Sequence, residues 1–471
     1  MKGQVMKTEN TEQNIIDENK IYSILHKGSK YSSQEILDIL KSARDLKGLN
    51  MDSVSALMTV EDETLLNEIF KTAKEIKNKI YGQRLVIFAP LYVSNLCNNE
   101  CTYCAFRAGN KNIKRVALTQ EQIQDETLHL INEGHKRVLL VAGESYPQNK
   151  FEYILHAVDS VYKTKHANGE IRRVNVNIAP LDLAQFKELK KRDIGTYQLF
   201  QETYHKATYK DVHTKGKKAD YDYRLTAMDR AIEAGIDDVG IGVLFGLYDW
   251  KFEVLALLQH TQHLENKFGV GPHTISVPRI EPAGGSSYSL NPENAVSDSD
   301  FKKLIAILRI AVPYTGIIMS TRENSELRSE TFALGVSQIS AGSRTNPGGY
   351  SDENADAQAQ FSLGDHRCLD EVIKDIASMG YFPSFCTGCY RLGRTGADFM
   401  DLAKPGDIRN HCDPNAISTF MEYLMDYASD ETKSAGLKAI EKACKTMEPI
   451  PAQRSRKFIE KIKSGERDVY C

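Results

Sequence analysis

Between residues 84 and 342 the sequence alternates short runs rich in β-branched residues with longer amphipathic stretches. The short runs predict strands, and the longer stretches carry apolar residues at helical spacing. Regular alternation of strand and helix is typical of a parallel sheet, because parallel neighbours need a crossover connection. We expect eight strands, at residues 84–93, 137–143, 173–180, 196–203, 238–246, 273–280, 316–323 and 336–342.

Eight such repeats predict an α/β fold of the (β/α)8 TIM-barrel class. A doubly wound open sheet is the structural alternative, because it uses the same alternation. In a barrel the loops at the carboxyl ends of the strands carry the active site. Chemistry-bearing residues that directly follow a predicted strand are therefore the first candidates for function.

The segments that flank the barrel differ from it in pattern. Residues 1–83 predict an N-terminal helical extension whose last helix ends at Gly82. The barrel is expected over residues 84–380, with a long polar loop at 343–367 after the eighth strand. Residues 381–471 predict a small, mainly helical C-terminal module.

Charge and hydropathy exclude some classes of partner. The net charge is only −3, which gives no general attraction for nucleic acid or for an anionic membrane. No apolar run approaches the length of a membrane-spanning helix. The first residues are polar and acidic, unlike a secretory signal, so we expect a cytoplasmic protein.

Six of the nine cysteines fall into two tight groups. In a long chain without a secretory signal, such clusters indicate metal or cluster ligation more than disulfides. Cys97, Cys101 and Cys104 form a C-x3-C-x2-C group directly after the first predicted strand. Three thiolates suit a 4Fe-4S cluster in which one iron stays open. Zinc is the alternative, although no histidine lies nearby in the sequence.

The second group, Cys386, Cys389 and Cys412, has the spacing C-x2-C-x22-C. One interpretation is a structural zinc site completed by His411, and the other is a second 4Fe-4S cluster with an open iron. The remaining cysteines have no partners at ligand spacing. We expect Cys368 and Cys444 to be buried and Cys471 to be exposed.

The first cysteine group, followed two positions later by Phe106, resembles the motif of the radical S-adenosylmethionine (SAM) superfamily. The resemblance implies that SAM binds the open iron and that electron transfer cleaves it to a 5′-deoxyadenosyl radical. It also implies SAM contacts at the ends of the strands. Gly143 would allow close backbone approach, Glu144 would accept from the ammonium group with Ser145 beside it, and Gln201 or Glu202 would bind the ribose. Tyr103 and Phe106 would flank the adenine.

The pair of cysteine groups together resembles the radical SAM tyrosine lyases that mature FeFe-hydrogenase. That resemblance implies cleavage of the Cα–Cβ bond of L-tyrosine to p-cresol and dehydroglycine, which breaks down to CO and cyanide on iron. This additional iron would be bridged to the second cluster by a free cysteine and held by a histidine. An electron donor such as a ferredoxin or flavodoxin, and other hydrogenase maturases as acceptors, are the implied partners.

Two further segments complete the implied site. At the end of the seventh strand, Arg322 suits a substrate carboxylate, with the hydroxyls of Ser320 and Thr321 beside it. Arg279 is a candidate for the same face of the barrel. His273, at the start of the sixth strand, is the expected ligand of the additional iron, and the fallbacks are His260 and His263.

His273 would lie at the opposite mouth of the barrel from the first cluster. This position for an iron ligand is possible only if the C-terminal module covers that mouth of the barrel. It also requires a channel for CO and cyanide through the barrel.

Two other functions stay open. A thiamine-pathway tyrosine lyase would stop at dehydroglycine and lack the second cysteine group, and a non-catalytic iron–sulfur scaffold would not use SAM.

Overall fold

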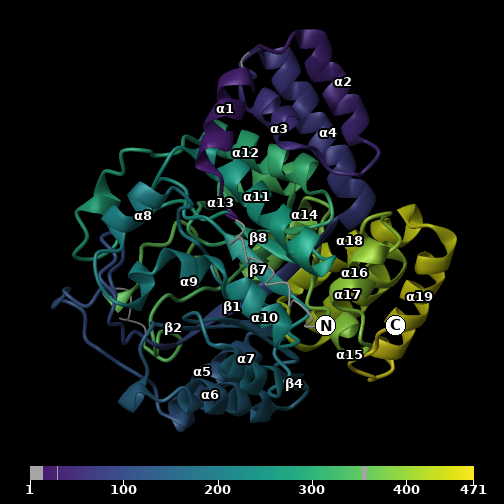
Figure 1. Ribbon diagram of the computed structural model, residues 1–471. Helices are drawn as coiled ribbons and strands as arrows, with labels where there is room; N and C mark the ends of the chain where they lie inside the picture. Colours follow the sequence, from purple (N-terminus) through teal and green to yellow (C-terminus); the bar gives the residue numbers. More distant parts are fainter. Residues whose placement is uncertain (1–13, 29, 353–357) are drawn as a thin grey trace, which may run out of the picture.

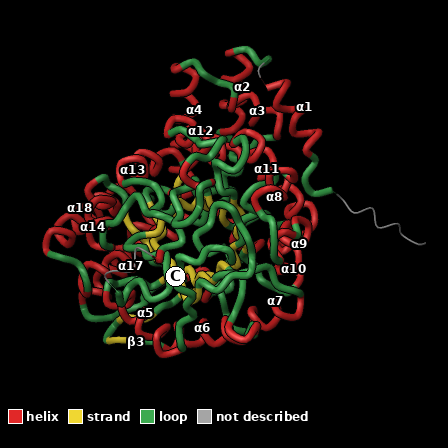
Figure 2. The backbone as a smooth tube through the Cα atoms, turned by 90° about the vertical axis from the view of Figure 1, so that its left-hand side faces the viewer, coloured by secondary structure: helices red, strands yellow, loops and turns green. Residues whose placement is uncertain are grey.

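The computed structural model describes residues 14–28, 30–352 and 358–471. Eight parallel strands follow one another around a closed barrel, and β10 pairs with β1 to complete it. This closure confirms the expected barrel and excludes the open doubly wound sheet. In Figure 2 the strands lie in the middle of the molecule with helices around them. The strands are β1 (Arg84–Ser94), β2 (Arg137–Ala142), β5 (Arg173–Asn177), β6 (Tyr197–Gln198), β7 (Val239–Gly242), β8 (Thr274–Ser276), β9 (Gly316–Met319) and β10 (Val336–Ser340).

Side chains of β1 alternate between the barrel interior and the surrounding helices, as the pleat of a strand requires. Leu85 and Ile87 are fully buried in the apolar core shared with the helices. Arg84, Val86 and Phe88 instead line cavities inside the barrel. The inward-facing side chains of β1 therefore change in character along the strand, from the cation of Arg84 at its beginning to the aromatic ring of Phe88.

Amphipathic helices cover the outside of the barrel, and most begin with a residue whose side chain caps the first turn. They are α5 (Gln120–Asn132), α6 (Glu152–Lys163), α7 (Leu183–Lys190), α8 (Lys206–Val212), α9 (Tyr221–Leu225), α10 (Ala227–Glu233), α11 (Trp250–Phe268), α12 (Asp298–Ala311), α13 (Ser325–Leu334) and α14 (Leu369–Ser378). A small hairpin pairs β3 (Lys165–His166) with β4 (Gly169–Glu170). Short 3-10 helices occur at Pro147–Asn149, Lys217–Ala219 and Tyr288–Leu290.

The N-terminal helices form a separate layer, drawn at the top of Figure 1, that packs against α11, α12 and α13. They are α1 (Glu18–Gly28), α2 (Ser33–Ala43), α3 (Met51–Met58) and α4 (Glu63–Tyr81). The last of them ends at Gly82, which has a φ of 59° and which the sequence predicted as the stop. The chain then enters β1 directly, so this layer is fixed to the first strand of the barrel.

The C-terminal segment begins by extending the barrel sheet. Strand β11 (Phe382–Ser384) pairs with the beginning of β1, with Phe382 opposite Arg84. Five helices follow and lie at the right of Figure 1: α15 (Gly388–Arg391), α16 (Gly396–Ala403), α17 (Arg409–Asp426), α18 (Asp430–Thr446) and α19 (Pro449–Lys463). Because β11 joins the amino end of β1, this module covers the mouth of the barrel opposite to the loop of Cys97, Cys101 and Cys104.

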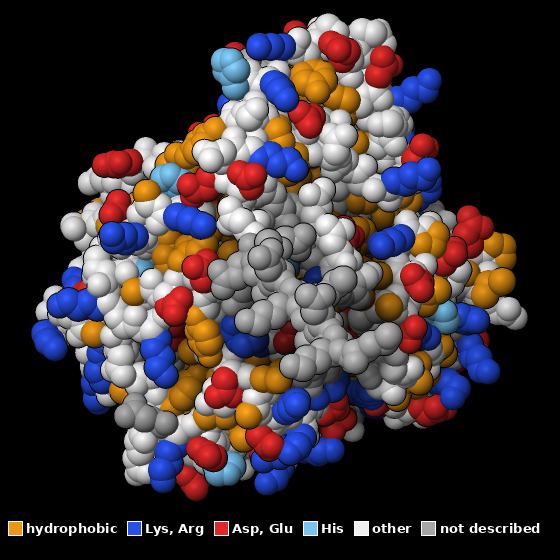
Figure 3. All heavy atoms as spheres, viewed as in Figure 1, with side chains coloured by type: hydrophobic (Ala, Val, Ile, Leu, Met, Phe, Trp, Pro, Cys, Tyr) orange, Lys and Arg blue, Asp and Glu red, His pale blue; other side chains and the backbone are white. Residues whose placement is uncertain are grey.

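Basic and acidic side chains are interspersed on the face shown in Figure 3, as the small net charge of −3 leads one to expect. Within the described ranges, no helix combines the length and the apolar character that crossing a membrane would need.

Candidate active site and second cysteine site

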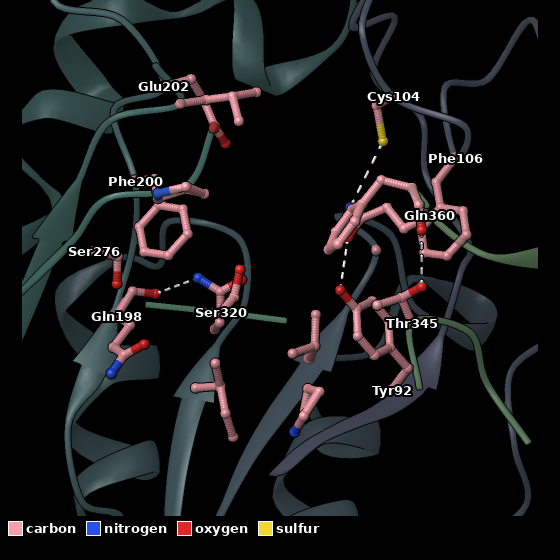
Figure 4. A pocket seen from close by; sticks show the side chains of 18 of the residues that line it. Tyr92, Cys104, Phe106, Gln198, Phe200, Glu202, Ser276, Ser320, Thr345 and Gln360 are labelled. Atoms are coloured by element: carbon pink, nitrogen blue, oxygen red, sulfur yellow. Dashed lines mark hydrogen bonds between the residues drawn. The ribbon is translucent and has the colours of Figure 1, made fainter. Parts of the chain in front are cut away.

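A cavity opens at the carboxyl ends of the barrel strands, and all three cysteines of the first group line it. Figure 4 shows its two walls: Cys104, Phe106, Gln360 and Tyr92 on one side, and Glu202, Phe200 and Ser320 on the other. The predicted residues that line this cavity are Cys97, Cys101, Tyr103, Cys104, Phe106, Gly143, Glu144, Glu202, Ser320, Thr321 and Arg322. Residues predicted from separate strands are thus brought together around one space.

The loop that carries the three cysteines is held in place by backbone hydrogen bonds. The N–H of Thr102 donates to the carbonyl of Val212 at 3.0 Å, and the N–H of Cys104 donates to the carbonyl of Cys101 at 3.1 Å. Burial raises the pKa of the Cys97 thiol to about 11. A metal is needed to hold such a thiol as a thiolate at neutral pH. Three thiols around one cavity fit a 4Fe-4S cluster that would keep one iron without a protein ligand.

Gly143, at the end of β2, lies directly against the cysteine loop. Its N–H donates to the carbonyl of Ser94 at 2.8 Å. A Cβ at this position would come within 2.2 Å of the main-chain oxygen of Leu96, the residue before Cys97. Only glycine fits here, because backbone atoms cannot give way as a flexible side chain can.

Glu144 is the centre of a buried charge network beside the first cysteine group. Arg224 donates to one carboxylate oxygen at 2.8 Å, and Asn99 donates to the other at 2.8 Å. Burial pushes the pKa of Glu144 up, but Arg224 and Lys218 together hold it below its usual value. Glu144 is therefore a fixed anion at the cavity wall, suited to accept hydrogen bonds from an ammonium group.

Glu202 lies on the same wall, and Lys218 donates to its carboxylate at 2.7 Å. The backbone of Glu202 has a φ of 72°, a conformation that non-glycine residues rarely adopt. Such conformations cluster at functional sites, where the surrounding structure enforces them. Two predicted neighbours face elsewhere: Gln201 is buried with its side-chain amide toward the carbonyl of Tyr221, and Ser145 accepts from Asn98.

The two aromatic residues of the cysteine loop have different surroundings. Tyr103 is buried, and its hydroxyl is hydrogen-bonded to Nε2 of His213 at 2.8 Å. Phe106 packs edge to face against Tyr92, with ring centroids 6.2 Å apart. Both residues line the cavity, Phe106 as an apolar wall and Tyr103 with its hydroxyl bound to His213.

The side chain of Arg322 is fixed in position, and N–H groups of its guanidinium remain available to an anion. Its guanidinium stacks on the ring of Phe361 at 3.3 Å, and Nη1 donates to the carbonyl of Arg279 at 3.4 Å. Within the described part of the chain it makes no ion pair with a carboxylate. Arg279 itself is occupied, because Glu323 accepts from its Nε at 3.0 Å. A cation fixed by stacking, with N–H groups left over, suits a substrate carboxylate.

A second cavity lies at the amino ends of the strands and brings the second cysteine group together with His273. Cys386, Cys389, Cys412 and His273 all line it. His273 directly precedes β8, and its Nδ1 lies 3.6 Å from Asp238. Burial lowers the pKa of His273, so the ring stays neutral and able to bind a metal. The thiols and this imidazole fit a second cluster with an additional iron beside it.

The other histidines and cysteines are arranged differently. His260 is hydrogen-bonded to the hydroxyl of Tyr204, and His263 to Asp229, so neither fallback lines the second cavity. Cys444 is buried as predicted. Two predictions were wrong. Cys368 is exposed because it caps the beginning of α14, and Cys471 is half-buried because Asn415 binds its main chain. Among the described residues, no three His, Cys, Asp or Glu side chains are arranged to hold one metal ion.

Comparisons with known proteins agree with this geometry. The family model "Radical SAM superfamily" matches residues 91–258, and "Biotin and Thiamin Synthesis associated domain" matches residues 276–382. The chain is 30% identical to 2-iminoacetate synthase of Escherichia coli (strain K12), over 75% of this chain and 92% of that protein. The chain belongs to the radical SAM superfamily.

Two solved structures place this radical SAM chain more narrowly. A crystal structure of HydG, a maturase of the [FeFe]-hydrogenase, is 51% identical and covers 98% of this chain and 100% of its own, with a TM-score of 0.94. HydG from Carboxydothermus hydrogenoformans is 41% identical, covering 94% and 97%, with a TM-score of 0.82. The chain is therefore a HydG-like radical SAM enzyme.

Several residues of this radical SAM site were not predicted from the sequence. Lys218 and Arg224 come from the segment after β6, where no motif distinguishes them from surface cations. Gln360 donates to the Cys104 sulfur at 3.7 Å and accepts from the Tyr92 hydroxyl at 2.8 Å. Gln360 and Phe361 belong to the long polar loop after β10, and the length of that loop was the one available signal.

Proposed function

We propose that this radical SAM enzyme is a tyrosine lyase. It would cleave the Cα–Cβ bond of L-tyrosine to p-cresol and dehydroglycine, and convert dehydroglycine to CO and cyanide bound to iron for assembly of the FeFe-hydrogenase H-cluster. The observation that carries the proposal is the pair of cysteine groups at opposite mouths of one barrel, the second beside His273. The likeness to HydG along nearly the whole chain supports it.

At the first mouth, Cys97, Cys101 and Cys104 would hold the 4Fe-4S cluster. The cluster, with SAM on its open iron, supplies the 5′-deoxyadenosyl radical that starts the reaction. Glu144 would accept hydrogen bonds from the SAM ammonium group, and Glu202 from the ribose hydroxyls. Lys218 links the two carboxylates, because it donates to Glu202 at 2.7 Å and lies 4.0 Å from Glu144.

In the same cavity, Arg322 would bind the carboxylate of L-tyrosine. The stack on Phe361 fixes the plane of its guanidinium, which lowers the entropy lost when the substrate binds. Ser320 and Thr321 line the cavity next to it and offer hydroxyl groups to the substrate. Holding the substrate in one orientation beside the SAM site is the main catalytic contribution of these residues.

At the second mouth, Cys386, Cys389 and Cys412 would hold a second 4Fe-4S cluster, and His273 would bind the additional iron that a free cysteine bridges to it. The two cavities use alternate residues of the same strands: Ser340 and Ile318 line the first, and Gln338 and Gly316 line the second. About two residues per strand thus separate them, a distance of roughly 7 Å. A channel for CO and cyanide would cross this layer. A ferredoxin or flavodoxin would supply electrons, and other hydrogenase maturases would accept the product.

The test compares the wild type with Cys386→Ala, Cys389→Ala after cluster reconstitution, in the presence of SAM, reductant and tyrosine. We expect the wild type to make p-cresol, 5′-deoxyadenosine, CO and cyanide. The double variant should lose about four irons per chain and keep p-cresol formation, because one cube holds four irons. Cys444→Ala, a buried cysteine outside both cavities, is the matched control.

Other outcomes identify the alternatives. Wild-type enzyme that releases dehydroglycine without CO or cyanide would be a 2-iminoacetate synthase, the function of the Escherichia coli relative. A protein that holds both clusters but makes no 5′-deoxyadenosine would be a scaffold. Either result would overturn the proposal.

A further inference from the structure

Three neighbouring barrel strands begin with an arginine that points into the barrel. They are Arg84 on β1, Arg137 on β2 and Arg173 on β5, and Arg137 lies directly opposite Arg173 in the sheet. Each side chain is almost fully buried, with 5% to 6% of its surface exposed. A layer of cations inside a barrel is costly unless anions or carbonyl groups satisfy it, because burial removes the charges from water.

The three arginines are satisfied to different degrees. Arg173 donates to the carbonyls of Asp193 and Ile194 and stacks on Tyr390 at 3.5 Å. Arg137 donates through Nη1 to the carbonyl of Cys386 at 2.6 Å, but its Nε has no partner. The guanidinium of Arg84 makes no hydrogen bond or ion pair with any residue that the structure describes. The Nε of Arg173 also lacks a partner, but Arg84 and Arg137 line the second cavity and Arg173 does not.

The second cavity is positively charged. Arg394 also lines it, and among the lining residues Asp238 is the one carboxylate. Asp238 already accepts from the N–H of Gly396 at 3.1 Å. Arg84 and Arg137 lie near the expected ligand groups, because they line the same cavity as the three cysteines and His273. Arg84 and Arg137 therefore have hydrogen-bond donors available for an anionic ligand whose other end binds the cluster.

We propose that Arg84 and Arg137 form a carboxylate-binding subsite that holds the α-carboxylate of the free cysteine at the second cluster. This inference rests on the proposed function, which places that cysteine between the cluster and the additional iron. A planar guanidinium matches a carboxylate with two parallel hydrogen bonds, whereas cyanide has a single acceptor end. The bond from Arg137 to Cys386 fixes one donor next to the cluster ligands. The subsite selects an amino acid over a simple thiol.

The experiment measures ligand binding to the reconstituted enzyme with both clusters and ferrous iron. The probes are L-cysteine, cysteamine, which lacks the carboxylate, and 3-mercaptopropionate, which lacks the amine. Dissociation constants come from equilibrium dialysis and from the change in the EPR spectrum of the second cluster. We expect the wild type to bind L-cysteine at least about ten-fold more tightly than cysteamine, since hydrogen bonds to charged groups carry that much. It should bind 3-mercaptopropionate more tightly than cysteamine.

Arg84→Met should abolish this preference, so that L-cysteine and cysteamine bind within about two-fold of each other. Arg173→Met is the matched control, because Arg173 belongs to the same layer but does not line the cavity. It should keep the wild-type ratio. Arg84→Lys keeps the charge without the two-pronged geometry and should retain only part of the preference. This second variant keeps the test decisive if Arg84→Met fails to hold its clusters.

The stability of the cluster-free protein tests a purely structural role for Arg84. The guanidinium faces the Tyr81 ring at 5.7 Å but has no hydrogen-bond or ion-pair partner among the described residues. If it serves ligand binding, Arg84→Met should leave the unfolding temperature unchanged or raise it, whereas a purely structural role predicts that the temperature falls. The inference is overturned if wild type binds cysteamine as tightly as L-cysteine, or if Arg84→Met keeps the preference. Formation of p-cresol by the same preparations reports on the proposed function separately, because tyrosine cleavage occurs at the other mouth of the barrel.

Discussion

At the scale of single residues, the first cavity is built from close contacts that few other side chains would fit. Gly143 is the clearest example, because it packs against the backbone that leads into Cys97. Arg224 and Lys218 are another, since both compensate carboxylates that line the SAM cavity. The glycine could be predicted from its place after a strand. The two cations could not, because a lysine or arginine in a loop is usually solvated.

Gly143→Ala should detach the first cysteine loop while leaving the second cluster intact. The added Cβ would lie 2.2 Å from the Leu96 oxygen, so the backbone before Cys97 must move. We expect iron to fall from about eight to about four per chain, as one cube of four is lost. Formation of 5′-deoxyadenosine should fall at least about ten-fold, because a displacement near 1 Å can cost a hundred-fold in rate.

Gly284→Ala is the control for this substitution, because no atom lies within 4 Å of a Cβ built there. It should keep its iron and its activity. A Gly143→Ala protein with a full complement of iron and normal SAM cleavage would show that the close contact has no functional role.

At the scale of elements, the strand positions followed the hydrophobic pattern, but several strands are shorter than predicted. β6 was predicted over residues 196–203 and ends at Gln198, although the N–H groups of Leu199 and Gln201 still donate to the carbonyls of Gly240 and Gly242. β11 was not predicted, since three residues carry little periodic signal. Its pairing with β1 nevertheless decides where the second cysteine group lies.

The segment 466–471 is a further element whose position beside the second cysteine group was not predicted from the sequence. Asp468 donates through its N–H to Glu422 at 2.5 Å, and the hydroxyl of Ser418 donates to the carbonyl of Val469 at 2.6 Å. Asn415, one helical turn after Cys412, exchanges two hydrogen bonds with the main chain of Cys471, at 2.8 Å and 3.0 Å. This segment therefore braces the helix that carries Cys412.

Removal of residues 466–471 should destabilise the second cluster selectively. We expect the truncated protein to lose about four irons per chain and to keep the first cluster and SAM cleavage. Iron and sulfide analysis, with 5′-deoxyadenosine as the second readout, measures this. Cys471→Ser keeps the main-chain bonds and should keep the iron. Equal loss in both variants would instead indicate that the Cys471 thiol itself binds the cluster.

At the scale of the whole molecule, one barrel presents two cavities at opposite mouths. The barrel and the first site could be predicted, because both depend on local pattern and on motifs directly after strands. The position of the second site could not, because it depends on how a distant segment docks onto β1. Buried ionisable groups between the barrel and the N-terminal helices also affect the stability of the whole fold.

Glu253 gives the stability of this fold a defined pH dependence. It is fully buried on α11, where Thr203 and the N–H of Tyr204 donate to its carboxylate. Burial raises the pKa of Glu253 from its usual 4.5 to about 8. The folded chain therefore keeps a proton that the unfolded chain releases between pH 4.5 and pH 8. Since the folded state binds more protons in this window, the free energy of unfolding falls as pH rises through it.

Glu253→Gln removes this ionisation and keeps an amide that can still accept from Tyr204 and donate to Thr203. The unfolding temperature of the variant minus that of wild type should therefore increase from pH 5 to pH 8. The gain at pH 8 should be on the order of 2–4 kcal/mol. Scanning calorimetry of the cluster-free proteins at both pH values measures it. Glu68→Gln, in an exposed ion pair worth about 1 kcal/mol or less, should show a small difference at both values. A Glu253→Gln difference that stays constant or shrinks with rising pH would mean that Glu253 is ionised in the folded protein.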